Sequence, residues 1–178
     1  WDKGSINVLD FTKRMEDSGA SMVTVHGRTR AMLYSGTAVW DYIRKVKDQL
    51  SIPVIANGDI VDTPSALRCM KWTGADGIMI GRATFGDPWI FQQVSAALAG
   101  QEVPQRPILK DRIAVAVKQF ELSEQVHGEH IACLEARKHF AWYLRGVRNA
   151  SYYKKEITSM NTMEDIYRIA KDIVRDLE

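Results

Sequence analysis

The first hundred residues alternate between two hydrophobic patterns. In one, apolar side chains recur at spacings of three and four, which is typical of a helix with one buried face. The other is a short and almost wholly apolar run, which is typical of a buried strand. The predicted helices cover 7–18, 40–50, 62–70 and 88–99. The predicted strands cover 21–26, 52–57 and 76–82. Strands that alternate with helices form a parallel sheet covered by helices, so this region is predicted to be α/β.

The pattern changes after residue 100. The segment 101–107 has two prolines within four residues and no periodicity, which indicates a linker. From residue 108 onward only helical spacing is found, over 109–127, 130–147 and 163–177, with a short polar connection around 149–161. We therefore predict an α/β domain at 1–100, a linker at 101–107 and an all-α bundle of three or four helices at 108–178.

Composition narrows the class of protein. The chain has 178 residues, of which 46% are hydrophobic and 26% charged, with a net charge of +2. These values fit a soluble globular protein and argue against a disordered, collagenous or disulfide-stapled one. No run approaches the roughly 18 apolar residues of a membrane helix, and no signal-peptide succession opens the chain, so a cytoplasmic protein without a membrane partner is expected. Cys69 and Cys133 lie in apolar helical surroundings and are predicted to be buried free thiols.

The near-neutral total charge hides a basic segment. Residues 131–155 contain six basic side chains and one acidic one. A compact basic patch favours a polyanion, because affinity depends on how many phosphates are neutralised together. A solvated basic helix face explains the same pattern, and the residues alone leave both interpretations open.

Polar residues and glycines follow each predicted strand. The strand ends carry His26-Gly27-Arg28-Thr29-Arg30, Asn57-Gly58-Asp59 and Gly81-Arg82. Ligands of parallel α/β sheets bind at the carboxyl ends of the strands. Glycines allow main-chain N–H groups to approach phosphate oxygens, and arginines add charge-assisted hydrogen bonds. The pattern predicts an anion-binding rim, although Asn-Gly and Gly-Arg are also common in ordinary turns and His26 could be a core histidine.

These segments together resemble the tRNA-dihydrouridine synthase family, in particular its bacterial B-type branch. The resemblance rests on His26-Gly27-Arg28-Thr29-Arg30, on 53–60, on 74–82, on Gly86-Asp87-Pro88-Trp89-Ile90-Phe91 and on 136–146, in this order and spacing. It covers most of the chain and combines motifs from both predicted regions.

The resemblance implies an FMN-dependent enzyme with a TIM-barrel domain and a C-terminal helical tRNA-binding domain. Such enzymes reduce the C5=C6 bond of a uridine in tRNA with electrons from NADPH. The residues that would bind FMN are His26 against the flavin ring, and Asn57, Gly58, Asp59, Gly81 and Arg82 around the phosphate. The residues that would contact tRNA are Arg28, Arg30, Arg137, Lys138, Arg145 and Arg148, and either of the first two could instead meet the cofactor.

The resemblance also implies that part of the family's domain is missing here. The family's proton-donating cysteine belongs to a loop in the first half of the barrel, and neither Cys69 nor Cys133 matches it, so no catalytic residue is expected within this chain. We expect strands six to eight of the barrel, an inactive fragment, and association with the missing half or with itself through open sheet edges. Asp87 stands where the family usually has asparagine.

Two other functions fit parts of the pattern. One is an RNA-binding helical module beside a non-catalytic half barrel, and the other is a different phosphate-binding FMN barrel oxidoreductase. The second explains the glycine-arginine turns but not the basic helix. His127 and His130 lack a third ligand, so no metal site is expected. The sequence does not identify the uridine that is reduced.

Overall fold

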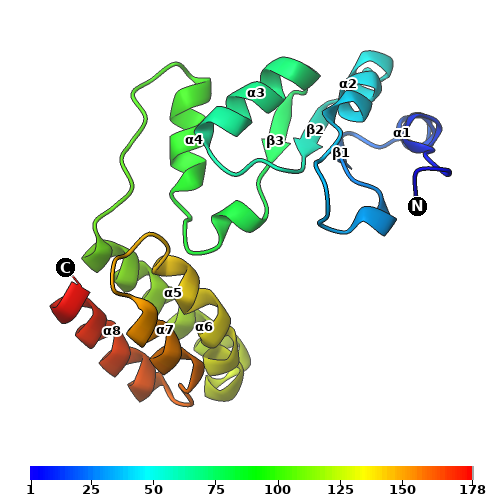
Figure 1. The fold of residues 1–178 in the computed structure, drawn as a ribbon. Coiled ribbons are helices and arrows are strands. Elements are labelled where there is room, and N and C mark those ends of the chain that lie inside the picture. Colours follow the sequence, from blue (N-terminus) through cyan, green and yellow to red (C-terminus); the bar gives the residue numbers. More distant parts are fainter. Residues whose placement is uncertain (178) are drawn as a thin grey trace. The chain divides into compact units, whose positions relative to one another are not determined.

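The computed structural model describes residues 1–177, which form two compact units (Figure 1). The first unit comprises Trp1–Ala83 and Ile90–Pro104, and the second comprises Thr84–Trp89 and the chain from Gln105 onward. None of the helices in this part of the chain combines the length and the apolar character needed to cross a bilayer.

The first unit is a three-stranded parallel sheet with helices between its strands (Figure 1). The strands are β1 (Val23–His26), β2 (Val54–Asn57) and β3 (Gly77–Met79), in that order in the sheet. The helices are α1 (Val8–Asp17), α2 (Trp40–Gln49), α3 (Thr63–Thr73) and α4 (Ile90–Leu98). The predicted alternation is confirmed, with strands two to four residues shorter than predicted. Two short 3-10 turns, η1 (Arg30–Met32) and η2 (Arg82–Thr84), follow β1 and β3 and were not predicted.

Local chemistry fixes the start of α3. Asp62 accepts a hydrogen bond from the backbone N–H of Ser65 at 2.8 Å, and the Ser65 hydroxyl oxygen accepts one from the N–H of Asp62. This capping box satisfies two N–H groups that the helix leaves open, and Pro64 needs no such partner. The hydrogen bonds from Ser65 lower the pKa of Asp62. Gly74 ends the helix in the left-handed conformation.

The two faces of the sheet differ in exposure. Val25, Val54 and Ala56 point to the helices and are at most 5% exposed. Side chains that alternate with these along the strands point to the other face and are more accessible. Thr24, His26 and Met79, on that face, are exposed. Among residues 1–177, the helices of this unit thus cover one face and leave the other accessible.

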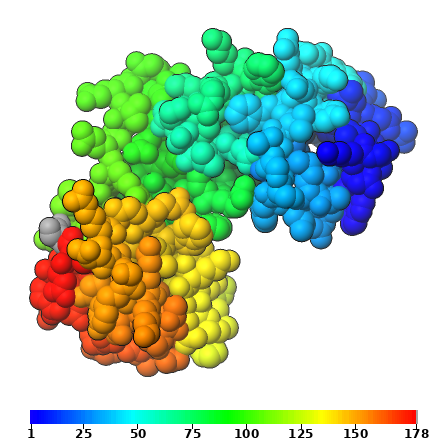
Figure 2. All heavy atoms as spheres, in the orientation of Figure 1, coloured from blue at the N-terminus to red at the C-terminus, as the bar shows by residue number. Residues whose placement is uncertain are grey.

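The second unit is a four-helix bundle, within the range predicted. Its helices are α5 (Leu109–His127), α6 (Glu129–Tyr143), α7 (Ser151–Thr158) and α8 (Met163–Leu177). They pack around fully buried side chains, the largest being Phe120, Phe140, Leu144, Ile157, Met160, Ile166, Ile169 and Ile173. On the face shown in Figure 2, these helices form one closely packed body.

Two details of the bundle correct the sequence prediction. The segment predicted as a polar connection contains α7, whose Tyr153 and Ile157 are buried one helical turn apart. Tyrosines and lysines dilute that apolar spacing in the sequence. Helix α6 ends at Tyr143 rather than at residue 147, because buried Arg112 donates hydrogen bonds to the carbonyls of Tyr143 and Arg145, and Gly146 then takes a positive φ.

The segment Thr84–Trp89, predicted to belong to the first region, groups with the second unit. Gly86 makes this possible: a Cβ at this position would lie 2.3 Å from the carbonyl carbon of Trp142. Arg106 holds the segment from the other side, donating to the Gly86 carbonyl at 2.9 Å and pairing with Asp87 at 3.4 Å. Backbone contacts of this kind leave no hydrophobic signature in a sequence.

Candidate functional site at the strand ends

The carboxyl ends of the three strands lie next to one another. His26 is paired in register with Asn57, and Asn57 with Met79. The N–H of Gly27 donates to the Asn57 carbonyl at 3.0 Å, and the Asn57 amide donates to the Met79 carbonyl at 2.7 Å. The prediction that the polar strand ends lie close together is confirmed, and the Asn57 side chain links β2 to β3 through its hydrogen bond.

Asp59 links the turns that follow the strands. Its carboxylate accepts hydrogen bonds from Arg28 at 2.8 Å, from the N–H of Ala38 at 2.7 Å and from Arg82 at 3.5 Å. Burial alone raises the pKa of Asp59, but the Ala38 N–H and the two arginines outweigh burial and hold the pKa below its usual value. Asp59 therefore stays ionised and fixes both guanidinium groups.

Arg28 lies inside the loop after β1. Its side chain is only 3% exposed, and it donates to the carbonyls of Ser35 and Gly36 as well as to Asp59. The Nη1 atom is buried without a hydrogen-bond partner in the described part of the chain. Arg30, in contrast, is exposed and lies 5.9 Å from the centre of the Trp1 ring. The structure thus separates two arginines that the sequence left equivalent.

The two glycines of the site differ in the space around them. Gly58 has a φ of +117°, and a Cβ there would lie 2.8 Å from the Cβ of Ala38. Its carbonyl accepts a hydrogen bond from the Trp40 indole at 2.9 Å. A Cβ at Gly81 would meet no atom within 4 Å, so the space above this turn is open.

Arg82 and His26 are exposed residues of the strand ends. Arg82 has a half-exposed side chain whose guanidinium lies 4.4 Å from the centre of the Tyr34 ring. His26 is exposed, and its Nδ1 accepts a hydrogen bond from the N–H of Arg28 at 3.1 Å. The bond occupies Nδ1 and leaves Nε2 to carry the ring proton. Tyr34 and Trp40 were not recognised from the sequence, since both act through contacts made only in the fold.

A cavity of about 690 Å³ opens beside β1. It is lined by His26, Arg28 and Arg30 together with residues that precede α1 and residues of the loop before α2. This volume falls in the range of small-molecule and cofactor sites, about 300–1,000 Å³. The hydroxyl of Thr29, which also lines it, is buried without a partner among residues 1–177.

The basic residues predicted in the second unit have different environments. Arg137 donates to the Met160 carbonyl and to the Asn161 side chain, both at 2.7 Å, and so ties α6 to the segment between α7 and α8. Lys138, Arg145 and Arg148 are exposed. The Arg145 guanidinium lies 4.5 Å from the centre of the Trp142 ring.

Both cysteines are free and buried, as predicted. Burial in α3 raises the pKa of Cys69 to about 11, despite a hydrogen bond with Thr73. Burial also raises the pKa of Cys133. Both thiols therefore stay protonated and inaccessible at neutral pH.

Comparison with known proteins assigns the chain to a family. A sequence model described as "Dihydrouridine synthase (Dus)" matches residues 1–177. The chain belongs to the dihydrouridine synthase family. The curated relatives of this family member include the tRNA-dihydrouridine synthase B of Pasteurella multocida, 37% identical over 90% of this chain and 48% of the relative. The corresponding protein of Vibrio cholerae is 39% identical over 92% of this chain and 51% of the relative.

A third relative is the probable tRNA-dihydrouridine synthase of Rickettsia conorii, 39% identical over 90% of this chain and 49% of the relative. The chain thus spans about half the length of these curated relatives. The family resemblance read from the sequence is confirmed, and the matches include relatives named as the B type.

Proposed function

We propose that this chain is the C-terminal part of an FMN-dependent tRNA-dihydrouridine synthase. In this proposal β1, β2 and β3 are the last three strands of a TIM barrel, residues 108–178 form the tRNA-binding domain, and the whole protein reduces the C5=C6 bond of a uridine in tRNA. The observation that carries the proposal is the convergence of three polar strand ends in a member of this family. A match that extends across both units favours this function over a stand-alone RNA-binding module or an unrelated flavin barrel.

The residues at the strand ends fit an FMN phosphate. A dianionic phosphate needs several N–H donors and at least one cation in a fixed cradle. Gly58 shapes its turn with a φ of +117° and packs closely on Ala38, and the space beside the Cα of Gly81 is open. Arg82 supplies an accessible cation, and buried Arg28 has a guanidinium nitrogen without a partner among residues 1–177. The carboxylate of Asp59 would repel a phosphate, so we assign it the role of holding Arg28 and Arg82.

The remaining site residues would position the flavin and the RNA. His26 would lie against the flavin ring, with its orientation set by the N–H of Arg28. Asn57 is held by Met79 and would present a fixed strand end. When bound and reduced by NADPH, FMN would supply the hydride, which together with a proton from another group saturates the uracil C5=C6 bond.

We place the proton donor in the part of the family's domain that this chain does not span. Cys69 and Cys133 are buried in the two cores with raised pKa values, which suits neither of them for proton transfer to a uracil. The 178-residue chain alone is therefore expected to be inactive and to need the other half of the barrel. Without that half, the open face of the sheet and the edges of β1 and β3 favour self-association.

Among the basic residues predicted to contact tRNA, the exposed ones are better placed to bind its phosphates than the buried or hydrogen-bonded ones. Arg30, Lys138, Arg145 and Arg148 are exposed, whereas Arg28 and Arg137 are engaged by groups of their own unit. We therefore assign phosphate contacts to the four exposed residues. Arg28 and Arg137 would act by holding the segments that carry the binding surface.

Flavin binding to the chain itself tests the proposal. Titration with FMN and with riboflavin, which lacks the phosphate, should show a preference for FMN, observed by quenching of flavin fluorescence. Arg82→Ala should reduce that preference at least about tenfold and leave riboflavin binding unchanged. Arg14→Ala, which removes an exposed cation of α1 that lines neither cavity of this unit, is the control. Equal affinities for FMN and riboflavin in the unmodified chain would contradict the phosphate cradle.

A further inference from the structure

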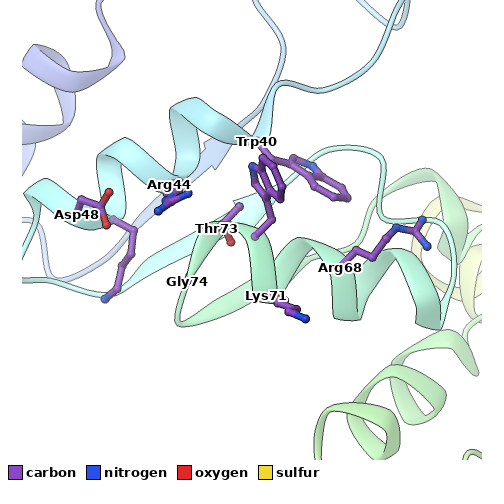
Figure 3. Close-up of a pocket in the computed structure, with 9 residues that line it drawn as sticks. Trp40, Arg44, Asp48, Arg68, Lys71, Thr73 and Gly74 are labelled. Carbon is purple, nitrogen blue, oxygen red and sulfur yellow. The ribbon is translucent and has the colours of Figure 1, made fainter.

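A second cavity lies between α2 and α3 and shares no lining residue with the one at the strand ends (Figure 3). Its volume is about 730 Å³. The side chains that matter are Trp40, Arg44 and Lys47 of α2, and Arg68, Lys71 and Trp72 of α3. We call this cavity the α2–α3 groove.

Four cations line the groove in two matched pairs. Arg44 and Lys47 are three residues apart on α2, and Arg68 and Lys71 are three residues apart on α3, so each pair occupies one helix face. Lys47 is neutralised by Asp76, at 2.7 and 2.9 Å. Within residues 1–177, no ion pair joins the other three cations to a carboxylate.

Only two of these four cations occupy positions where a positive charge stabilises its own helix. Lys47 and Lys71 lie in the last turns of their helices, where a positive charge interacts favourably with the helix dipole. Arg44 and Arg68 lie in mid-helix and gain little from the dipole. One carboxylate, that of Asp48, lines the groove, so its net charge remains positive.

An indole ring is held open beside these cations. Trp72 is 55% exposed, and its Nε1 donates to the Asp41 carboxylate at 2.9 Å, which fixes the direction of the ring. Trp40, at the start of α2, is fixed by its bond to the Gly58 carbonyl. A fixed, exposed indole next to several cations is the combination that binds a nucleotide, because the ring stacks on a base and the cations meet the phosphate.

We propose that the α2–α3 groove binds a nucleotide unit, with its phosphate on Arg44, Arg68 and Lys71 and its base on Trp72. A free mononucleotide and an RNA strand both offer this chemistry. Cations on two helices exceed what one phosphate requires and suit successive phosphates, so we assign the groove to a single-stranded RNA segment. The inference needs neither flavin nor uridine reduction, so it can fail or succeed independently of the proposed function.

Binding of a labelled single-stranded oligouridylate to the full chain tests this inference. Affinity is measured by fluorescence anisotropy at several salt concentrations, and contact with the groove by quenching of tryptophan emission. We expect quenching, and an affinity that falls as salt rises. Arg68→Glu combined with Lys71→Glu should weaken binding at least about tenfold, and Trp72→Phe should abolish most of the quenching.

Position 45 supplies a matched control. Lys45 is next to Arg44 on α2 and equally cationic, but it lies beside the Tyr42 ring and does not line the groove. Arg44→Glu should weaken oligouridylate binding several-fold more than Lys45→Glu. Equal losses would overturn the inference, because they would indicate non-specific attraction. Uridine 5′-monophosphate binding as tightly as the oligomer would overturn the assignment to an RNA strand, and quenching that persists in Trp72→Phe would overturn the stacking contact. Circular dichroism of each variant confirms that it is folded.

Discussion

The Arg28 guanidinium lies 2.7 and 2.8 Å from the two carboxylate oxygens of Asp59, which joins the turn after β1 to the turn after β2. The Arg28 side chain is 3% exposed and that of Asp59 is 28% exposed. A surface ion pair contributes little to stability, but removing one partner of a buried pair leaves the other charge without compensation. The geometry of the candidate cradle therefore depends on this pair.

Asp59→Asn should destabilise the first unit by about 1–3 kcal/mol, because Arg28 would keep its charge without a carboxylate. Asparagine tolerates the φ of +55° found at this position, so the change tests charge rather than backbone strain. Urea unfolding followed by tryptophan fluorescence measures the effect. Asp10→Asn, which breaks the exposed pair with Arg14, is the control and should cost less than about 0.5 kcal/mol. Similar losses in the two variants would contradict a structural role for the Arg28–Asp59 pair.

Glu16 forms a contact between α1 and the segment before β2 that we expect to be sensitive to acid. Its carboxylate accepts hydrogen bonds from the N–H groups of Ser51 and Ile52 and from the Ser51 hydroxyl, and it pairs with Lys13. Lys13 and Ser51 lower the pKa of Glu16 from 4.5 to about 2. Because the folded state holds the proton more weakly than the unfolded state, this contribution is complete above pH 4.5 and is lost as pH falls towards 2.

Glu16→Gln should therefore flatten the pH dependence of the urea midpoint between pH 4.5 and pH 2. Asp17→Asn serves as the comparison, since it removes the other carboxylate beside Lys13 and leaves the bonds to Ser51 and Ile52 in place. That variant should keep the steep loss of stability in acid. The same slope in both variants would show that Glu16 does not produce it.

Gly86 and Gly146, both in the second unit, allow the cost of a close contact to be separated from the cost of backbone strain. Both have a positive φ, but a Cβ at Gly86 would collide with the α6 backbone at 2.3 Å, whereas one at Gly146 would meet nothing within 4 Å. Gly146→Ala should cost about 1 kcal/mol from backbone strain alone, and Gly86→Ala about 1–3 kcal/mol more from overpacking. Thermal unfolding measured by circular dichroism separates the two costs. Equal destabilisation would mean that the segment around Gly86 moves away from α6 without cost.

The sequence was most informative where one local rule acts. The alternation of strand and helix follows from the hydrophobic period, and the polar strand ends follow directly from the residues after each apolar run; both are observed. Parallel strands bring their carboxyl ends to one edge, so the neighbourhood of His26 and Asn57 could also be predicted.

Features that arise from tertiary contacts could not be predicted. The sequence does not distinguish Arg28 from Arg30, because burial of Arg28 depends on carbonyls seven and eight residues later that the folded loop turns inward. Likewise, Arg137 has the same charge as Lys138, but only Arg137 reaches the carbonyl of Met160. The charge pattern of a sequence can locate a basic helix. Only the packing of the folded chain shows which of its cations are free to bind a phosphate.

This distinction predicts which substitutions on α6 and in the turn after it affect RNA binding. Lys138→Glu combined with Arg145→Glu should weaken binding of an unmodified tRNA and reduce the slope of log affinity against log salt by about 1.5, since each lost phosphate contact lowers it by roughly 0.7–0.9. Lys171→Glu, at an exposed position of α8, is the control for charge alone and should change the slope much less. Arg137→Ala should instead lower the unfolding temperature, because two hydrogen bonds between α6 and the segment before α8 are lost. An unchanged salt slope in the Lys138 and Arg145 double variant would show that neither residue contacts the RNA phosphates, whatever the effect of the double variant on stability.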